Sequence, residues 1–393
     1  MRTVVFVGAG HTHLHALRAW ARRPPANARL VVISESSVST YSGMLPGVLA
    51  GQYSRDAMEI DVVGLCRAAA AELIIGRWTG LDRERRVLHI EGHDDRSFDV
   101  ASIGIGSIPT FRGVTVTDPS RLVPVKPMVT FLDRLDHRLL TAQRERSGRP
   151  LRIAVVGGGA GGVELALCLP PHVDLQLGGG ALCERTLITG GSQLVPGAPP
   201  RAAALSWQAC VRAGVRVVRG RRVAGVDGTA LTLSDGTTVD ADIVLWATTA
   251  VATPALASLG LPTDARGFPL TLDTLQVISG HPIFVVGDSG TVVAARLPKA
   301  GVTAVREGPV LWRNLQRLLS ERPLVCYRPR RKFLQLLNTG DGQAIADWRG
   351  WSCKGTWCWR LKNVIDRRFV AKFRLEGLRP HVRGRLIARA ARR

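Results

Sequence analysis

The sequence of 393 residues predicts an α/β protein built on two parallel β-sheets. Two phrases support this prediction, residues 2–17 (RTVVFVGAGHTHLHAL) and residues 152–166 (RIAVVGGGAGGVELA). Each reads as an apolar strand that enters a helix through a glycine-rich turn. Strand-like and helix-like segments alternate along the chain, which is typical of parallel sheets with helices on both faces. We therefore expect two βαβ units, each with its own turn.

The first predicted unit opens with a buried strand over residues 2–7 and, after the turn, a helix over residues 13–22. A second buried strand over residues 28–36 ends at Glu35. Residues 40–53 are rich in glycine and small residues and contain one proline, so they are predicted as loop and short helix. RVLHIEG and SFDVASIGIGSIP then predict strands of a β-meander that returns to the first sheet.

A helix over residues 129–146 leads into the second unit, whose later strands are predicted in RTLITGG, VRVVRGRRVAGVDG and TALTLSDGTTVDADIVLWATTA. Residues 281–290 (HPIFVVGDSG) predict a late apolar strand that ends in Gly-Asp. A helix-compatible run follows Pro298. Beyond Glu321 the pattern changes to short strands, tryptophans and a basic helix, which predicts a small C-terminal α+β domain.

The second glycine turn has the full pattern of a dinucleotide pyrophosphate site. Gly157 allows the tight turn, Gly159 lets a pyrophosphate approach the backbone, and Gly162 lets the helix pack close to the strand. The N-terminus of the helix offers N–H groups and a positive dipole end to the phosphates. A preceding strand and a following helix make the signal strong.

The first turn is a degenerate copy, with Gly8 and Gly10 but His13 at the third position. Glu35 supports a nucleotide site here, because a carboxylate at the end of the second strand can accept hydrogen bonds from a ribose hydroxyl pair. A plain tight turn with a solvated loop carboxylate is the alternative.

The second unit lacks such an acid, since RTLITGG ends in Gly190 and Gly191. Nothing there selects a free 2′-hydroxyl, so the choice between NADH and NADPH stays open. A turn that no longer binds a nicotinamide nucleotide is the alternative.

The net charge is +22, and residues 351–393 carry 13 Lys and Arg against two acids. No nucleic-acid recognition motif accompanies this charge, so nucleic acid is not expected as a partner. Tryptophans precede the basic helix, which carries apolar residues at a spacing of four and many basic residues. The residues concerned are Trp348, Trp351, Trp357, Trp359; Leu361, Ile365, Phe369; and Lys362, Arg367, Arg368, Lys372. This pattern predicts either membrane-surface contact or a packed domain with a solvated basic face.

No apolar run approaches the roughly 18–20 residues of a membrane-spanning helix, and no signal peptide is recognised, so a cytoplasmic protein is expected. The seven cysteines are odd in number and scattered, which favours reduced thiols. Cys353 and Cys358 are spaced C-x4-C; two unrelated thiols are the favoured interpretation and a redox pair the alternative. No metal site is predicted.

Three further phrases complete a characteristic order: GIGSIP lies between the two glycine turns, and LWATTA and then FVVGDSG follow the second. In this combination the chain resembles the FAD-dependent pyridine nucleotide–disulfide oxidoreductases, and among them the type II NADH:quinone dehydrogenases. VGAGHTHLHALR, YSGMLPGVLAGQY, LLNTGDGQAIADWRG and WRLKNVIDRRF are similar to the subgroup linked to selenophosphate synthase. The resemblance implies two Rossmann-like domains, one for FAD and one for NAD(P), with central parallel sheets and β-meanders, plus the small C-terminal domain.

The resemblance also implies which residues bind FAD. The pyrophosphate and adenosine ribose would contact the first turn and the end of the second strand, and two later loops would close on the flavin. The residues implied are Gly8, Gly10, His11, Glu35, Gly106, Ser107, Gly287 and Asp288, with Tyr41 to Pro46 and Lys299 to Val302 (including Ala300 and Gly301) beside the isoalloxazine ring.

For NAD(P)H the resemblance implies the second turn and a loop beside it. The residues are Gly157, Gly159, Gly162, Glu164, Ala247 and Thr248. Hydride would pass from the nicotinamide to the flavin, with a positive group stabilising the reduced flavin anion. Lys299, or the N-terminus of the helix near Ala300, is the candidate for that group, and a surface lysine is the alternative. Lys299 and Glu164 are the predicted catalytic residues.

The chain departs from related families at three places. TYSGMLPGVLAG has no cysteine, which excludes a thiol relay there. LLNTGDGQAIAD has none of the cysteines that sulfide:quinone oxidoreductases use, and Cys168 is predicted as a core helix residue. Val302 and Arg306 stand near the places where type II dehydrogenases commonly have glutamines.

The sequence therefore predicts an FAD-dependent NAD(P)H dehydrogenase that passes electrons to a quinone-type acceptor. The alternatives are a sulfide or selenium-compound:quinone oxidoreductase and a flavin-bearing redox partner of selenophosphate synthase. The predicted location is the cytoplasm, with peripheral contact at the inner face of the cell membrane, and a homodimer is left open. The predicted domains are residues 1–120 and 251–320 for FAD, 121–250 for NAD(P), and 321–393 for the basic, tryptophan-rich C-terminal domain.

Overall fold

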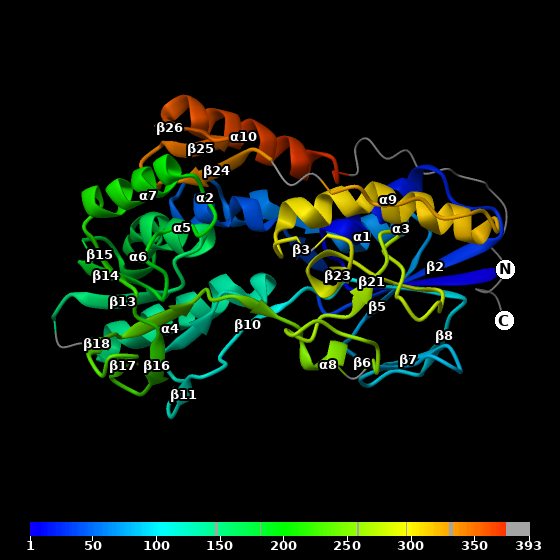
Figure 1. The fold of residues 1–393 in the computed structure, drawn as a ribbon, viewed down its shortest axis with the longest axis horizontal. Coiled ribbons are helices and arrows are strands. Elements are labelled where there is room, and N and C mark those ends of the chain that lie inside the picture. The colour runs from blue at the N-terminus through cyan, green and yellow to red at the C-terminus, as the bar shows by residue number, and fades with distance from the viewer. Residues whose placement is uncertain (146–147, 181, 258, 296, 330–332, 375–393) are drawn as a thin grey trace, which may run out of the picture.

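The computed structural model describes residues 1–145, 148–180, 182–257, 259–295, 297–329 and 333–374. Two five-stranded parallel sheets form its centre. In Figure 1, β2 and β5 of one sheet lie on the right, and β13, β14 and β15 of the other lie on the left. The first has the order β22-β9-β1-β2-β5, from Ile283–Val285, Val100–Ile103, Arg2–Val7, Ala28–Ser34 and Glu72–Ile75. The second has the order β12-β19-β13-β14-β15, from Leu122–Pro124, Ile243–Trp246, Leu151–Val156, Cys183–Thr189 and Val215–Arg219. These sheets confirm the predicted α/β fold class.

The central strands are apolar along their whole length because both faces of each sheet are covered. Residues 3–7 of β1 and residues 153–156 of β13 are buried without alternation, as expected for parallel strands between helical layers. Strand β22 comes from late in the chain, so the sequence that forms the second sheet lies between β9 and β22 of the first sheet.

Helices pack over the two central sheets and around the smaller ones. They are α1 (His11–Arg22), α2 (Leu45–Leu49), α3 (Val62–Ala68), α4 (Phe131–Glu145), α5 (Ala160–Cys168), α6 (Pro170–Leu177), α7 (Pro200–Arg212), α8 (Pro254–Ala257), α9 (Gly301–Leu319) and α10 (Thr356–Ala371). Short 3-10 helices are η1 (Ser42–Met44), η2 (Arg55–Met58), η3 (Met128–Thr130) and η4 (Gly287–Ser289). Helices α1 and α9 pack side by side, with the rings of Trp20 and Trp312 5.9 Å apart.

Small sheets surround the two central ones. They are β3-β4 (Val38–Thr40, Glu59–Asp61), β6-β7-β8 (Trp78–Asp82, Val87–Ile90, Arg96–Ser97), β10-β20 (Ile108–Pro109, Ala250–Val251), β11-β16-β17-β18 (Thr115–Val116, Val223–Val226, Ala230–Leu233, Thr238–Asp240) and β21-β23 (Leu270–Thr271, Thr291–Val292). Strands β6 to β8 form an antiparallel meander, as the sequence predicts for this region.

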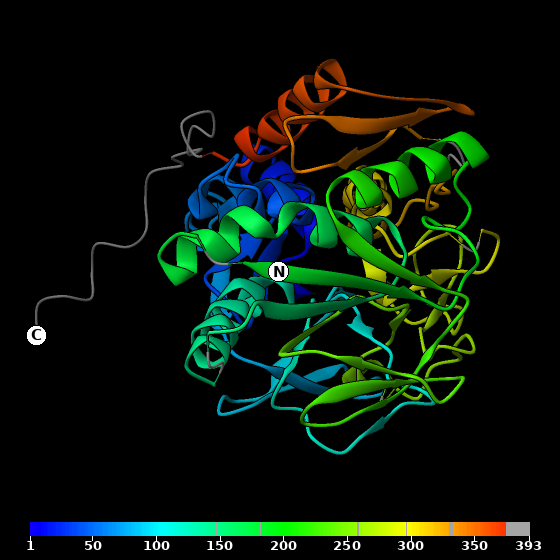
Figure 2. The same ribbon diagram turned by 90° about the vertical axis from the view of Figure 1, so that its left-hand side faces the viewer.

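The C-terminal part is an antiparallel sheet, β24-β25-β26 (Gln335–Asn338, Ala344–Trp348, Trp351–Gly355), followed by α10. Figures 1 and 2 show these orange and red elements lying across one side of the molecule, over α2, α5 and α7. Residues 375–393, which carry the rest of the predicted basic tail, lie outside the described residues.

Several predicted boundaries differ from the structure. Helix α1 begins at His11 and not at residue 13, because Gly10 already serves as its N-cap. The late strand predicted over residues 281–290 is confined to Ile283–Val285, since the following Gly-Asp segment turns into η4. The helix predicted over residues 129–146 starts as η3 and becomes α-helical at Phe131.

Among the described residues, none of the helices combines the length and the apolar character needed to cross a bilayer. The described part of the chain also contains no group of three or more side chains arranged to hold a metal ion.

Candidate functional site

The first glycine turn joins β1 to α1 at the carboxyl edge of the first sheet. Gly8 has φ +90°, and a Cβ there would lie 2.5 Å from the carbonyl oxygen of Gly104. Gly10 is the N-cap of α1 and has no side chain to cap the first N–H groups of the helix. Such free N–H groups bind phosphate, so the turn fits the pyrophosphate of a dinucleotide.

His13 occupies the third position of this turn and is fully buried. Its Nδ1 lies 2.5 Å from the carbonyl oxygen of Gly8, and its Nε2 lies 2.8 Å from Oγ of Ser102. The ring stacks on Phe6 with centroids 4.7 Å apart. Burial lowers the pKa of His13 to about 4, so the ring is neutral at neutral pH. His13, which departs from the glycine motif, therefore stabilises the turn through its hydrogen bonds.

Glu35 follows the last residue of β2 and is exposed. Strand β2 pairs in parallel with β1, so Glu35 lies at the same edge of the sheet as Gly8. This is the place where a carboxylate can accept hydrogen bonds from a ribose. Its role in FAD binding stays a prediction, which this position supports.

Gly106, Ser107 and Asp288, which the resemblance implies as FAD contacts, lie together around a lysine that the sequence did not single out. Nζ of Lys126 lies 2.6 Å from Oδ2 of Asp288 and 2.6 Å from Oγ of Ser107. The Gly106 N–H donates to Oγ of Ser289 at 2.8 Å. Lys126 stands in a segment without a motif, and only the fold places it against a residue far along the chain.

His11, the first residue of α1, has a buried Nε2 with no hydrogen-bond partner in the described residues. Its ring lies against Tyr41 and Phe369, at centroid distances of 5.5 and 5.7 Å. Burial lowers its pKa to about 4, while Asp288 favours the protonated form and Lys126 opposes it. A buried polar atom is normally hydrogen-bonded, so Nε2 fits a phosphate or hydroxyl of a bound cofactor.

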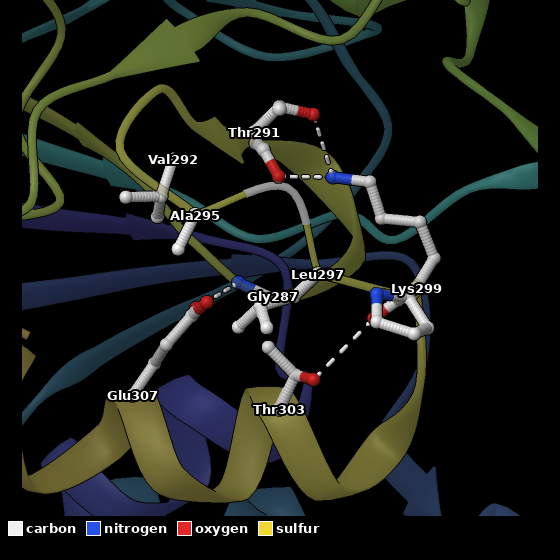
Figure 3. A pocket seen from close by; sticks show the side chains of 10 residues that line it. Gly287, Thr291, Val292, Ala295, Leu297, Lys299, Thr303 and Glu307 are labelled. Atoms are coloured by element: carbon white, nitrogen blue, oxygen red, sulfur yellow. Dashed lines mark hydrogen bonds between the residues drawn. The ribbon is translucent and has the colours of Figure 1, made fainter. Parts of the chain in front are cut away.

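Lys299 lies in a pocket whose lining is shown in Figure 3. Its ammonium donates to the carbonyl oxygen of Gly290 and to Oγ1 of Thr291, and lies 4.1 Å from the ring centroid of Phe268. Burial lowers its pKa to about 8. The side chain is therefore held inside the protein and is not a freely solvated surface lysine. Its predicted role beside the flavin is not tested by these contacts.

The other side of the same pocket is formed by α9. Glu307 is buried and its Oε2 accepts from the Gly287 N–H at 2.5 Å (Figure 3). Burial raises the pKa of Glu307 to about 8. Ala300 is the N-cap of α9 and Gly301 its first residue, while Pro46 is buried in α2. The sequence did not point to Glu307.

The second glycine turn joins β13 to α5. Gly157 has φ +129°, and a Cβ there would overlap the carbonyl oxygen of Ala247, while a Cβ on Gly162 would overlap that of Gly157. Gly159 is the N-cap of α5 and faces open space. The Thr248 hydroxyl donates to another loop of the protein. The three glycines therefore stand where the three roles of a dinucleotide motif require them.

Glu164 is partly buried near the start of α5. Its Oε1 accepts from the backbone N–H of Asn338 at 2.8 Å. Burial raises the pKa of Glu164 to about 7, against the opposing effects of Lys362 and of the Asn338 N–H, while Asp366 raises it further. A carboxyl group with this pKa can give and take a proton near neutral pH.

The C-terminal elements supply the surroundings of Glu164. Nζ of Lys362 donates to Oδ2 of Asp366 at 2.8 Å and to the carbonyl oxygen of Gly43 at 2.7 Å. The hydroxyl of Tyr41 donates to Oδ1 of Asp366 at 3.2 Å. Lys362 is therefore not part of a solvated basic face, which corrects that part of the sequence prediction. The sequence did not reveal this cluster of Tyr41, Lys362 and Asp366, because Tyr41 lies far along the chain from the other two residues.

A second connection passes through Gln52. Its Oε1 accepts from Nδ2 of Asn338 at 2.7 Å and from Nε1 of Trp359 at 2.8 Å. The Tyr41 ring also stacks on Phe369, with centroids 4.3 Å apart. The C-terminal elements are thus bonded to both dinucleotide units beside the predicted site.

Cys353 and Cys358 lie with their Sγ atoms 3.8 Å apart, so the structure brings the two thiols together. Burial raises the pKa of Cys358 to about 11, which disfavours the reactive thiolate there. Cys168 is buried on α5, as predicted, and its pKa is raised by burial.

Comparison with known proteins shows relatives with nicotinamide and quinone chemistry in their names. The chain is 26% identical over 188 residues to a type II NADH:quinone oxidoreductase of Haemophilus influenzae, covering 45% of this chain and 42% of the relative. It is 27% identical over 234 residues to an alternative NAD(P)H-ubiquinone oxidoreductase of Arabidopsis thaliana, covering 51% and 43%. The chain therefore spans less than half the length of these curated relatives.

Among solved structures, NDH2 of Plasmodium falciparum in complex with NADH has a TM-score of 0.77 at 14% identity, covering 95% of this chain and 97% of that one. The sulfide:quinone oxidoreductase of Aquifex aeolicus has a TM-score of 0.74 at 16% identity, covering 97% and 93%. At these identities the likeness establishes the fold. Residues 2–308 match the family described as pyridine nucleotide-disulphide oxidoreductase, which supports FAD and NAD(P)H as the cofactors. The chain belongs to this family.

Proposed function

We propose that the protein is an FAD-dependent oxidoreductase that oxidises NAD(P)H and passes the electrons to a quinone-type acceptor. The observation that supports this most is the presence of two dinucleotide turns, at Gly8–Gly10 and Gly157–Gly162, on two parallel sheets of one chain. FAD, when bound, supplies the chemistry, since it accepts a hydride and releases electrons singly or in pairs. The names of the relatives support the quinone as acceptor.

The residues of the first unit would hold and orient the flavin nucleotide. The N-terminus of α1 and Nε2 of His11 would bind phosphate, and Glu35 would bind the adenosine ribose. Asp288 and Lys126 form an ion pair of 2.6 Å at the adjoining loop, which would hold the loop in place. In the second unit, the N-terminus of α5 beyond Gly159 would bind the pyrophosphate of NAD(P)H.

Glu164 would hold one of the two protons that quinone reduction consumes, and solvent would supply the other. Reduction of a quinone to a quinol takes up two protons, and a carboxyl group with a pKa of about 7 is protonated or ionised with similar ease at neutral pH. Its neighbours Lys362 and Asp366 bias that balance in opposite directions. Lys299, with a pKa of about 8, would keep a positive charge beside the flavin, in the role predicted for it.

The proposed function is tested by anaerobic stopped-flow spectroscopy of the purified protein. Flavin absorbance should bleach on mixing with NADH or NADPH and return on addition of a soluble quinone analogue. The control is Gly159→Ala, which places a methyl group where the pyrophosphate would approach. This variant should keep its flavin and bleach with dithionite but lose reduction by nucleotide. A wild-type protein that is colourless and takes up no FAD on reconstitution would contradict the proposal.

We also propose that α10 and the β25-β26 turn contact the inner face of the cell membrane from the cytoplasm. The side chains of Trp351, Trp357 and Ile365 are 84%, 59% and 41% exposed, although all three are large and apolar. Arg367 and Arg368 are exposed on the same helix. Indole rings and basic side chains together favour an anionic bilayer surface.

Co-sedimentation with phosphatidylglycerol vesicles tests the membrane proposal. Replacing Trp351 and Trp357 by serine should release the protein from the vesicles without changing its unfolding curve. The matched control is Leu175→Ser, which removes a side chain that is 76% exposed on α6. Equal sedimentation of both variants and wild type would argue against this surface.

A second candidate reaction, oxidation of a sulfide or selenium compound, is favoured by the 3.8 Å separation of the Cys353 and Cys358 Sγ atoms. The raised pKa of Cys358 opposes it, because the thiolate is the reactive form. Replacing both cysteines by serine should leave NAD(P)H:quinone turnover unchanged under the main proposal. Loss of sulfide-dependent flavin reduction in that variant would instead support the second reaction.

The link to selenophosphate synthase is proposed from LLNTGDGQAIADWRG and WRLKNVIDRRF, which form the β24-β25 hairpin and part of α10. A complex with that enzyme should be seen in sedimentation-velocity experiments on the two purified proteins. Independent sedimentation at micromolar concentration would remove this partner.

A further inference from the structure

The first sheet defines where a ribose-binding carboxylate stands. Val7 of β1 pairs with Ile33 of β2, and the Gly8 N–H donates to the carbonyl oxygen of Ile33 at 2.7 Å. Glu35 is therefore the second residue after the strand position that is bonded to the glycine turn.

The second sheet repeats this register. Val156 of β13 pairs with Ile188 of β14, and the Gly157 N–H donates to the carbonyl oxygen of Ile188 at 2.9 Å. The second residue after Ile188 is Gly190. The position that carries the acid in the first unit therefore carries no side chain in the second.

The space beside Gly190 is occupied by Arg222. A Cβ at Gly190 would lie 2.6 Å from Cγ and 3.2 Å from Nε of Arg222. Arg222 is held there because the strand end before it runs beside β14, with the Arg221 N–H donating to the carbonyl oxygen of Thr189 at 3.2 Å. An acidic side chain at Gly190 would require this arginine to move.

The surroundings of Gly190 are basic. Arg219 lies 4.1 Å from the ring centroid of Trp207 and donates to the carbonyl oxygen of Ser192 at 3.3 Å. Arg221 pairs with Asp235 at 2.8 Å, whereas Arg222 has no carboxylate within ion-pair distance among the described residues. Residues 190–199 contain no Asp or Glu.

We propose that the second unit binds NADPH in preference to NADH, with Arg222, assisted by Arg219, binding the 2′-phosphate of the adenosine ribose. The proposal rests on the proposed function, in which this unit binds the nicotinamide nucleotide. A carboxylate at this position would accept from a free 2′-hydroxyl and repel a 2′-phosphate, whereas a guanidinium donates charge-assisted hydrogen bonds to phosphate. The same place on the two sheets thus selects opposite ribose substituents.

Adenosine 2′,5′-bisphosphate and adenosine 5′-monophosphate, which differ only in the 2′-phosphate, are the probes. Binding of each to the purified holoenzyme is measured by calorimetry, with no turnover involved. We expect the bisphosphate to bind about tenfold to a hundredfold more tightly, as a charge-assisted hydrogen bond predicts. This ratio should fall as salt is raised, because the contact is partly exposed.

Arg222→Gln keeps most of the aliphatic stem against Gly190 and removes the charge, so it should abolish most of this preference. Arg216→Gln, an exposed arginine on β15, removes the same charge elsewhere on the unit and should leave the ratio unchanged. Equal binding of the two probes by the wild type, or an unchanged ratio in Arg222→Gln, would overturn the inference while leaving a nucleotide site. If neither probe binds, the nucleotide site of the proposed function is overturned as well.

The reverse experiment combines Gly190→Asp with Arg222→Ala, which removes the side chain that blocks the introduced carboxylate. In stopped-flow flavin reduction this variant should prefer NADH, and retained preference for NADPH would overturn the role of Arg222.

Discussion

The two glycine turns of this chain share one backbone arrangement but complete it with different side chains. In the second turn, Gly162 lies so close to the Gly157 carbonyl that a Cβ would overlap its oxygen. In the first turn, His13 stands at the corresponding position and its Nδ1 bonds the Gly8 carbonyl. The residue at the third position must therefore do one of two things. It either forms a hydrogen bond with the carbonyl oxygen of the first glycine, or it leaves that oxygen free of a steric clash.

The two units also differ at the position that follows their second strand, where the first unit has an acidic residue and the second has none. Glu35 is exposed at the edge of the first sheet, whereas Gly190 leaves its place to Arg222 in the second. Under the proposed function, one scaffold would present two nucleotides to each other with different ribose contacts. The comparison teaches that a motif position with an unusual residue can mark a site with a changed ligand contact. It need not mark a site that has lost its function.

The largest expected effect comes from breaking the second turn. Gly162→Ala should lower the free energy of unfolding by about 4 kcal/mol, in the range of the most damaging single substitutions, because its Cβ overlaps the Gly157 carbonyl oxygen. Urea unfolding followed by tryptophan fluorescence measures it. Gly161→Ala, whose Cβ meets nothing within 4 Å, is the control and should change stability little. Similar curves for the two variants would show that the turn tolerates the clash.

The next effect is the pH dependence contributed by Glu164. Its pKa in the folded protein is raised to about 7, so the folded state retains a proton that the unfolded chain releases near pH 4.5. This group therefore lowers stability as pH rises from about 4.5 to 7, by about 3 kcal/mol in total. Glu164→Gln should be more stable than wild type at pH 8 and similar at pH 4. An unchanged difference across this range would contradict the raised pKa.

The first unit should show the opposite sign through His13. Its pKa is lowered to about 4, so the unfolded chain takes up a proton near pH 6.5 while the folded state does not. Stability is therefore lost as pH falls from 6.5 to 4. His13→Gln should lose about 1 kcal/mol at pH 7, from the broken hydrogen bond, and should show a weaker loss on acidification. A steeper acid loss than wild type would argue against a neutral buried ring.

The smallest expected effect concerns ribose binding in the first unit. Glu35→Gln should weaken FAD binding about tenfold, the size of one charge-assisted hydrogen bond, and leave unfolding unchanged because the side chain is exposed. Flavin fluorescence during reconstitution of the deflavinated protein measures the affinity. Glu184→Gln, an exposed acid at the start of β14, is the matched control and should bind FAD normally. Equal affinities in both variants would remove Glu35 from the site.

The amino-acid sequence by itself determined the two glycine turns, the strands β1 and β13 that lead into them and the helices that follow. These features are local, because each is specified by about 20 consecutive residues. They are an apolar run that is buried on both faces, a glycine at positive φ and a helix N-terminus. Glu35 could be singled out for the same reason, since it follows its strand directly.

Only the tertiary structure decided which distant side chains complete the site. Lys126 meets Asp288, Glu307 bonds the Gly287 N–H, and Arg222 lies over Gly190 because parallel strands and packed helices bring separate segments together. The pKa values of His13 and Glu164 likewise follow from burial, which no local pattern specifies. Short-range sterics are encoded in neighbouring residues, whereas desolvation and charge pairing depend on everything that the fold places around a group.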